Sequence, residues 1–216
     1  MLYSLASSVY SLFYTIISVS KDKTYHIINK ETDETNDVDG DYVIIKRMRD
    51  KPLTESIYEH ITAPFISATK IDNTIYLGNA FNAADYNYIK NNGITAIVNA
   101  SKEISNYFET NSDLQYFKLD DVKDINSSSI KKYFDNFIHF VEKIKEENGK
   151  ILIHCFMGSS RSAILVVLYK VYFLGNKLEE SIKDITNKRG RVNINITFVE
   201  ELKDYLYEKD YLYKKN

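Results

Sequence analysis

The residues with the clearest chemical potential lie between Cys155 and Arg161. Cys155 is the single cysteine of the chain, and Arg161 follows it by six residues. A short loop that contains a glycine, here Gly158, can point its successive backbone N–H groups toward one centre and bind a tetrahedral anion there. The planar guanidinium of Arg161 can hold two oxygens of a phosphate. We therefore predict a phosphate-binding loop, with these residues around the anion: Phe156, Met157, Gly158, Ser159, Ser160 and Arg161.

A thiol at the centre of such a loop is expected to ionise readily. The N-terminus of a following helix, the converging amides and Arg161 all favour negative charge. The resulting thiolate would be a nucleophile directed at phosphorus, and it would need no metal. The alternative is an inert buried cysteine, as lone cysteines often are. A positive charge in the first turn of a helix is unfavourable for the helix dipole unless an anion lies nearby. The position of Arg161 therefore indicates an anion site and favours the reactive thiol over the inert one.

The surrounding elements place this loop at the edge of a sheet. Residues 150–154 (KILIH) read as a buried parallel strand, and residues 161–174 as a central apolar helix. Ligands of open α/β sheets bind at the carboxyl ends of such strands. Further strands are expected at 74–77, 94–99 and 116–119, and helices at 79–92, 127–147, 178–188 and 196–212. The alternation predicts an α/β fold with a largely parallel central sheet flanked by helices.

The first 66 residues have a different pattern, so we divide the chain into an N-terminal extension, 1–66, and a catalytic domain, 67–216. In the extension we expect an amphipathic helix over 1–20, short strands at 24–29 and 42–45, and a solvated acidic loop at 31–41, followed by a basic cluster at 46–51. The helix or the basic cluster could dock a kinase or a second copy of the chain, giving a homodimer. The alternatives are a helix packed on the domain and a solvated charged face.

Composition excludes several classes of function. The chain has 28 basic and 30 acidic residues, so we expect no strongly basic nucleic-acid binder. One cysteine and four scattered histidines provide neither a disulfide framework nor metal-ligand spacing, so no metal or other cofactor is expected. The sequence has no run of eighteen clearly apolar residues, so we expect no membrane span. A reactive thiol suits a reducing cytoplasm. The Asn-, Ile-, Lys- and Tyr-rich usage is typical of AT-rich genomes, including those of large DNA viruses. If the protein is viral, the expected location is the cytoplasm of the host cell.

Residues 154–162 (HCFMGSSRS) resemble the HCxxGxxR[S/T] signature of the cysteine-dependent protein tyrosine phosphatases, and the final Ser-Arg-Ser is most similar to the dual-specificity branch. Two other segments strengthen the resemblance. Residues 75–99 resemble the start of that domain, and residues 191–198 resemble its C-terminal part. In the latter, Ile194 stands where proline is usual and Thr197 where glycine is common. The resemblance covers about residues 67–213.

This resemblance implies a role for each residue of the signature. Cys155 would attack phosphorus and form a thiophosphate intermediate, and Arg161 would bind the phosphate and stabilise the transition state. His154 would orient the loop and tune the thiol through hydrogen bonds. Ser162 would donate to the sulfur of Cys155 and help it leave when the intermediate is hydrolysed.

The resemblance also implies an aspartic acid that protonates the leaving oxygen, about thirty residues before the cysteine. Three aspartates compete, and Asp120 is expected to point elsewhere by strand alternation. Asp124 lies 31 residues and Asp121 lies 34 residues before Cys155. We favour Asp124, because it keeps the following helix in register. Asp121 is the alternative, because it lies nearer the preceding strand.

A phosphoprotein is the substrate that the loop favours. Residues 156–160 contain no lysine or arginine for additional phosphates, unlike the loops of phosphoinositide phosphatases. The resemblance thus implies a dual-specificity phosphatase acting on phosphotyrosine and on phosphoserine or phosphothreonine. The alternatives are a catalytically weak pseudophosphatase that binds phosphoproteins and an RNA 5′-triphosphatase. The physiological substrate, the preference among phosphoresidues and the oligomeric state stay open.

Overall fold

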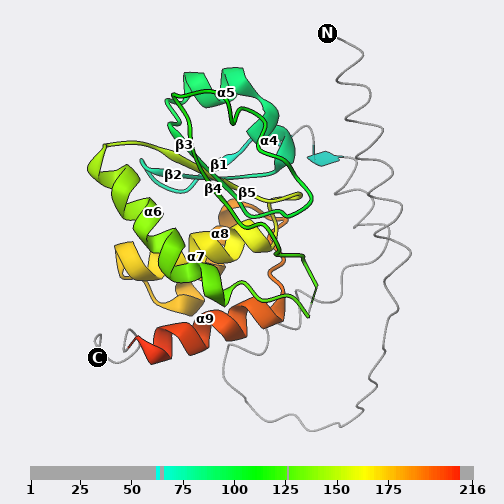
Figure 1. The fold of residues 1–216 in the computed structure, drawn as a ribbon. Helices are drawn as coiled ribbons and strands as arrows, with labels where there is room; N and C mark the ends of the chain where they lie inside the picture. Colours follow the sequence, from blue (N-terminus) through cyan, green and yellow to red (C-terminus); the bar gives the residue numbers. More distant parts are fainter. Residues whose placement is uncertain (1–61, 64–65, 126, 210–216) are drawn as a thin grey trace, which may run out of the picture. The chain divides into compact units, whose positions relative to one another are not determined.

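A computed structural model describes residues 62–63, 66–125 and 127–209 of the chain. In this part of the chain, five strands form one sheet in the order β1-β2-β5-β3-β4. Their bounds are Thr69–Lys70 for β1, Ile75–Gly78 for β2, Ala96–Asn99 for β3, Gln115–Lys118 for β4 and Ile151–His154 for β5. The short edge strand β1 is antiparallel to β2, and the other neighbours are parallel (Figure 1). The predicted largely parallel sheet is confirmed.

Helices cover both faces of this sheet (Figure 1). The short helices α4 (Ala80–Ala84) and α5 (Tyr86–Asn91) lie on one face. The other face carries α6 (Phe134–Glu146), α7 (Arg161–Leu174), α8 (Leu178–Lys188) and α9 (Ile196–Glu208). This three-layer arrangement explains why the central strands are apolar throughout and not alternating.

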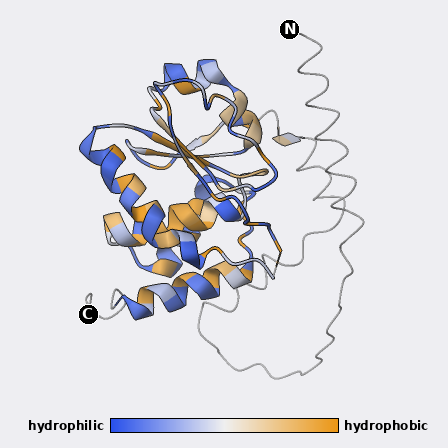
Figure 2. Ribbon diagram, in the orientation of Figure 1, coloured by the Kyte–Doolittle hydropathy of each residue, from blue (hydrophilic) through white to orange (hydrophobic). Residues whose placement is uncertain are grey.

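The two hydrophobic clusters follow the pleat of the strands. On β5, Ile151 and Ile153 pack in the larger cluster with α6, α7, α8 and α9, whereas Leu152 packs in the smaller cluster with Ile89 of α5. Figure 2 shows the result: apolar residues lie along the strands and α7, and hydrophilic residues lie on the outer sides of the peripheral helices. Helix α7 is buried over most of its length, as its sequence predicts.

Two predicted helices differ from the structure. The helix expected over 79–92 is broken at Asp85, whose carboxylate accepts a hydrogen bond from the Tyr88 N–H and so caps a new helix, α5. The helix expected over 127–147 begins later, with a 3-10 turn at Lys131–Tyr133 followed by α6. Glu201 of α9 accepts hydrogen bonds from the N–H groups of Ile130 and Lys131, and this cap from a distant element defines the later start.

The predictions for the N-terminal extension fall outside the described residues. They are the helix over 1–20, the strands at 24–29 and 42–45, the acidic loop and the basic cluster. The domain boundary near residue 66 stays a prediction. Within the described part of the chain, no helix is both long enough and apolar enough to cross a bilayer.

Candidate active site

The candidate site lies at the carboxyl edge of the sheet. Gly78, Asn99 and His154 end the neighbouring strands β2, β3 and β5 and stand in register. Residues 155–160, here called the phosphate loop, follow the central strand β5 and lead into α7. Glu103 comes shortly after β3 and Asp124 shortly after β4, so parallel pairing brings both carboxylates to the same edge as the loop.

Cys155 is buried, with 1% of its surface exposed, and its sulfur lies inside the phosphate loop. It accepts a hydrogen bond from the Gly158 N–H and another from the Ser162 hydroxyl, each at 3.2 Å. Cys155 is the only cysteine in the sequence, so it has no disulfide partner within the chain. Two donors directed at one sulfur stabilise negative charge on it.

Three carbonyl groups of the phosphate loop are bound by residues outside it. The pairs are Phe156 O with Ala80 N at 3.1 Å, Gly158 O with Arg189 Nε at 3.0 Å, and Ser159 O with Asn193 N at 2.9 Å. In a trans peptide the N–H of the next residue points opposite to the carbonyl. The N–H groups of Met157, Ser159 and Ser160 are therefore directed to the inner side of the loop, where an anion would lie.

Gly158 is required by the close packing of this loop. Its φ of +70° lies in the left-handed region. A Cβ at this position would overlap the carbonyl oxygen of Gly78, and it would lie 2.8 Å from the carbonyl carbon of Gly78 and 2.9 Å from Nη2 of Arg189. Only a residue without a side chain fits here.

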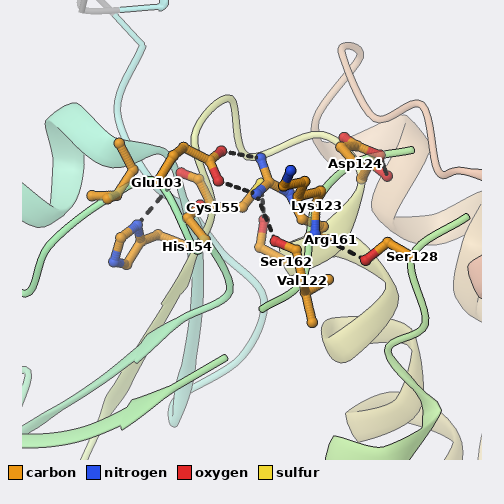
Figure 3. Close-up of polar contacts among 12 residues, drawn as sticks. Glu103, Val122, Lys123, Asp124, Ser128, His154, Cys155, Arg161 and Ser162 are labelled. Atoms are coloured by element: carbon orange, nitrogen blue, oxygen red, sulfur yellow. Dashed lines mark hydrogen bonds and ion pairs between the residues drawn. The ribbon is translucent and has the colours of Figure 1, made fainter. Parts of the chain in front are cut away.

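Arg161 is 4% exposed, and most of its donors are already engaged. Its Nη1 and Nη2 donate to the two carboxylate oxygens of Glu103, at 2.9 and 2.6 Å (Figure 3). A further contact joins Nη1 to the carbonyl of Val122, at 3.4 Å. Nε is buried and has no partner among the described residues. A guanidinium has five N–H donors, so the edge formed by Nε and Nη2 is left for a ligand.

The charges around Arg161 keep it protonated. Burial by itself would lower its pKa, but the nearby Cys155, Glu103 and Asp124 raise the pKa above its usual value. Figure 3 shows Glu103 and Asp124 flanking the guanidinium. The site therefore holds a permanent cation beside the sulfur at every physiological pH.

The structure separates the two competing aspartates. Asp124 accepts a 2.8 Å hydrogen bond from the hydroxyl of Ser160, so its carboxylate faces the phosphate loop. Asp121 binds the ammonium group of Lys132 and the hydroxyl of Tyr133 instead. That exposed ion pair lowers the pKa of Asp121, mainly through the hydrogen bond from Lys132. The contact with Ser160 favours Asp124. The register argument from the sequence loses its basis, because the helix begins later than the expected start at 127.

His154 is buried behind the loop, with 1% exposure. Its Nδ1 lies 3.4 Å from the carbonyl oxygen of Cys155, so it contacts the loop backbone and not the sulfur. Desolvation by burial lowers the pKa of His154 to about 4, which leaves the ring neutral at pH 7. A neutral ring adds no charge to the site, and its contact acts on the conformation of the loop.

Two residues of this site were not predicted from the sequence. Glu103 binds Arg161, and Arg189 binds the Gly158 carbonyl from the end of α8. The position of Glu103, four residues after the strand that ends at Asn99, was an available signal. Arg189 gave none, because a basic residue at the C-terminus of a helix is explained by the helix dipole alone.

The described chain is similar to known phosphatases. The family model "Dual specificity phosphatase, catalytic domain" matches residues 75–208. Protein phosphatase Slingshot of Drosophila melanogaster is 31% identical over 137 residues, which cover 63% of this chain and 13% of that protein. Dual specificity protein phosphatase 1-A of Xenopus laevis is 30% identical over 128 residues, which cover 59% of this chain and 34% of that protein.

The solved structures agree with this similarity. The human tyrosine phosphatase-like serine/threonine/tyrosine-interacting protein has a TM-score of 0.61 and 26% identity, over 68% of this chain and 98% of that chain. The chain thus spans only a small part of Slingshot and about a third of the Xenopus enzyme, but nearly all of the solved human chain. With a family model that covers more than half of its length, the chain belongs to the dual-specificity phosphatase family.

Proposed function

We propose that the protein is a phosphatase that hydrolyses phosphotyrosine and phosphoserine or phosphothreonine on proteins through a cysteinyl-phosphate intermediate. One observation carries the proposal. The sulfur of Cys155 accepts two hydrogen bonds inside a loop whose outward carbonyls direct its amides inward, next to Arg161, whose Nε has no partner among the described residues. A nucleophile, an oxyanion cradle and a phosphate clamp are then present in one place.

In the first step the Cys155 thiolate attacks phosphorus. The S–P bond forms as the bond between phosphorus and the leaving oxygen breaks, and protonated Asp124 gives its proton to that oxygen. The inward-facing amides and the Nε–Nη2 edge of Arg161 bind the non-bridging oxygens and stabilise the charge of the transition state.

In the second step water hydrolyses the intermediate. The carboxylate of Asp124 accepts a proton from the water as its oxygen attacks phosphorus, and the S–P bond breaks to release phosphate. Electrons return to the sulfur, where the Ser162 hydroxyl and the Gly158 N–H stabilise the thiolate. Asp124 regains its proton, and the cycle closes without a metal.

The substrate class rests on the loop and on the relatives. Residues 156–160 have no cationic side chain for a second phosphate, and both Slingshot and the Xenopus enzyme are named as protein phosphatases. We therefore propose phosphoproteins rather than RNA 5′-triphosphates. We also propose a cytoplasmic location, because the one cysteine is free and a reducing compartment would keep it so.

A phosphoprotein-binding module is the second candidate, because one similar structure is named a tyrosine phosphatase-like interacting protein. Such a module would bind a phosphopeptide through the phosphate loop without turning it over. The placement of Asp124 against Ser160 favours turnover, because it supplies the proton donor that a binder does not need.

The test is hydrolysis of a small aryl phosphate by the wild type and by Cys155→Ser, in EDTA, between pH 5 and pH 8. We expect turnover by the wild type, none by the serine variant, and a phosphorylated Cys155 in acid-quenched wild type by mass spectrometry. A folded wild type that binds a phosphotyrosine peptide without releasing phosphate would contradict the enzyme and support the binding module.

The N-terminal extension has a separate test. Docking of a kinase or of a second copy through residues 1–60 stays a prediction. Deletion of residues 1–60 should then lower activity toward a phosphoprotein but not toward an aryl phosphate. Equal losses on both substrates would indicate a structural role for this segment.

A further inference from the structure

Arg189 is a second buried arginine beside the phosphate loop. It ends α8, is 3% exposed, and contacts three groups from two distant parts of the chain. Its Nε donates to the Gly158 carbonyl at 3.0 Å, and its Nη1 donates to the carbonyl of Ser67 and to the hydroxyl of Thr69, each at 3.1 Å. The side chain thus ties the loop to the start of β1.

The guanidinium lacks an acidic partner among the described residues. Its hydrogen bonds there go to carbonyl and hydroxyl oxygens, and its Nη2 is buried with no hydrogen-bond partner in that part of the chain. A buried cation without an opposite charge costs several kcal/mol in general, so an anion is expected close by.

Three groups of the described chain affect the charge of Arg189. They are Arg191, Cys155 and Tyr88. Burial and the positive charge of Arg191 lower the pKa of Arg189 to about 10, which still leaves it charged at pH 7. Desolvation raises the pKa of Tyr88, so that phenol is neutral there. Cys155 and Arg189 meet at one residue of the loop, because the Cys155 sulfur accepts a hydrogen bond from the Gly158 N–H and Arg189 binds the Gly158 carbonyl. If this thiol ionises, the thiolate is the opposite charge that Arg189 lacks.

We propose that Arg189 is a positioning residue with two effects on the phosphate loop. It holds the Gly158 carbonyl outward, which turns the Ser159 N–H toward the bound phosphate, and it supplies the positive charge that balances the Cys155 thiolate. The effect on turnover rests on the proposed phosphatase function. The effect on the ionisation of Cys155 does not, because it can be measured in the free protein without a substrate.

A purely structural role would have a different signature. If Arg189 only joined the loop to β1, its loss would lower the free energy of unfolding but would not change how the ionisation of Cys155 depends on pH. The decisive measurement is therefore the rate of Cys155 alkylation by iodoacetamide as a function of pH. It is specific, because the chain has one cysteine.

The experiment uses the full chain and three variants. Arg189→Gln removes the charge, and Arg189→Lys keeps it but loses the fork that spans the loop and β1. Lys188→Gln is the matched control, because it removes the same charge from the neighbouring residue, whose ammonium group pairs with Asp184. Circular dichroism checks the fold of each variant.

We expect the alkylation midpoint of Arg189→Gln to rise by about one pH unit, the size of effect that one close opposite charge has. Arg189→Lys should restore at least half of that shift. Both Arg189 variants should lose about tenfold or more in kcat/KM toward an aryl phosphate, and Lys188→Gln should match the wild type in both assays.

Several results would overturn the proposal. An unchanged midpoint in folded Arg189→Gln would remove the charge effect. If Arg189→Gln does not fold, an alkylation midpoint raised by a full pH unit in Arg189→Lys would also contradict the charge effect, because lysine keeps the charge. Unchanged turnover in Arg189→Lys would contradict the effect on the Gly158 carbonyl. A wild type without turnover whose midpoint still depends on Arg189 would contradict the phosphatase but support this proposal.

Discussion

The hydroxyl of Ser160 donates a 2.8 Å hydrogen bond to the carboxylate of Asp124 and so joins the phosphate loop to the segment after β4. The same hydroxyl oxygen accepts a 3.1 Å hydrogen bond from the Asn195 N–H at the start of α9. Ser160 therefore connects three separate segments at the point where a leaving group would receive its proton. Asp121, three residues before Asp124, binds the hydroxyl of Tyr133 instead.

We expect Asp124→Asn to lower kcat toward a phosphotyrosine peptide by about a hundredfold or more, because a general acid contributes on that scale. The loss should be smaller for 4-nitrophenyl phosphate, whose leaving group needs less protonation. The limb on which kcat falls with rising pH should flatten, since that limb reports a group that must be protonated.

Asp121→Asn is the matched control for this experiment. Its carboxylate is exposed and bound to Lys132 and Tyr133, so kcat and the pH profile should stay close to those of the wild type. The reverse pattern, with the loss in Asp121→Asn and not in Asp124→Asn, would assign the general acid to Asp121.

The Ser160 contact predicts a coupling between two substitutions. Ser160→Ala should lower kcat, because the Asp124 carboxylate loses the donor that orients it. Residues that act together are not additive, so Ser160→Ala combined with Asp124→Asn should be little slower than Asp124→Asn alone. Steady-state kinetics of the four proteins give the coupling energy. Fully additive losses would show that Ser160 acts through the loop backbone and not through Asp124.

The two hydrogen bonds from Arg161 to Glu103 predict a loss of phosphate affinity when they are removed. Glu103→Ala frees the guanidinium to rotate, and we expect kcat/KM toward an aryl phosphate to fall about tenfold. Glu103→Gln keeps one acceptor oxygen and should retain most of the activity. Inhibition by inorganic phosphate provides a readout without turnover. A gain in phosphate affinity in Glu103→Ala would mean that Glu103 competes with the ligand.

The neutral, buried His154 predicts how stability depends on pH. Its folded pKa of about 4 lies below the usual value of 6.5, so the unfolded state binds more protons between these two values. The contribution of His154 is complete above about pH 6.5 and is lost as the pH falls toward 4, by at most about 1.4 kcal/mol per pH unit.

Urea unfolding of the wild type and of His154→Gln from pH 7 to pH 4.5 measures this contribution. Other groups titrate alike in both proteins, so the difference between the two curves belongs to His154. We expect the free energy of unfolding to fall more steeply with acidification in the wild type. Parallel curves would show that His154 can be protonated in the folded state without cost.

The sequence alone determined the layers of the fold and the reacting loop. Continuous apolar strands such as residues 151–153 can only be buried on both faces, and this requires helices on each side of a parallel sheet. The loop between Cys155 and Arg161 was recognisable because its residues are contiguous. Their chemistry depends on local backbone geometry, which a short sequence encodes directly.

Tertiary structure decided what contacts this loop from elsewhere in the chain. Glu103 and Arg189 lie 52 residues before and 34 residues after Cys155, and only strand order and helix packing bring them to it. The sequence already favoured Asp124 over Asp121, but the different partners of the two carboxylates are set only by the tertiary structure. A hydrogen bond between distant residues depends on where the whole fold places both ends, and that information is not local to either residue.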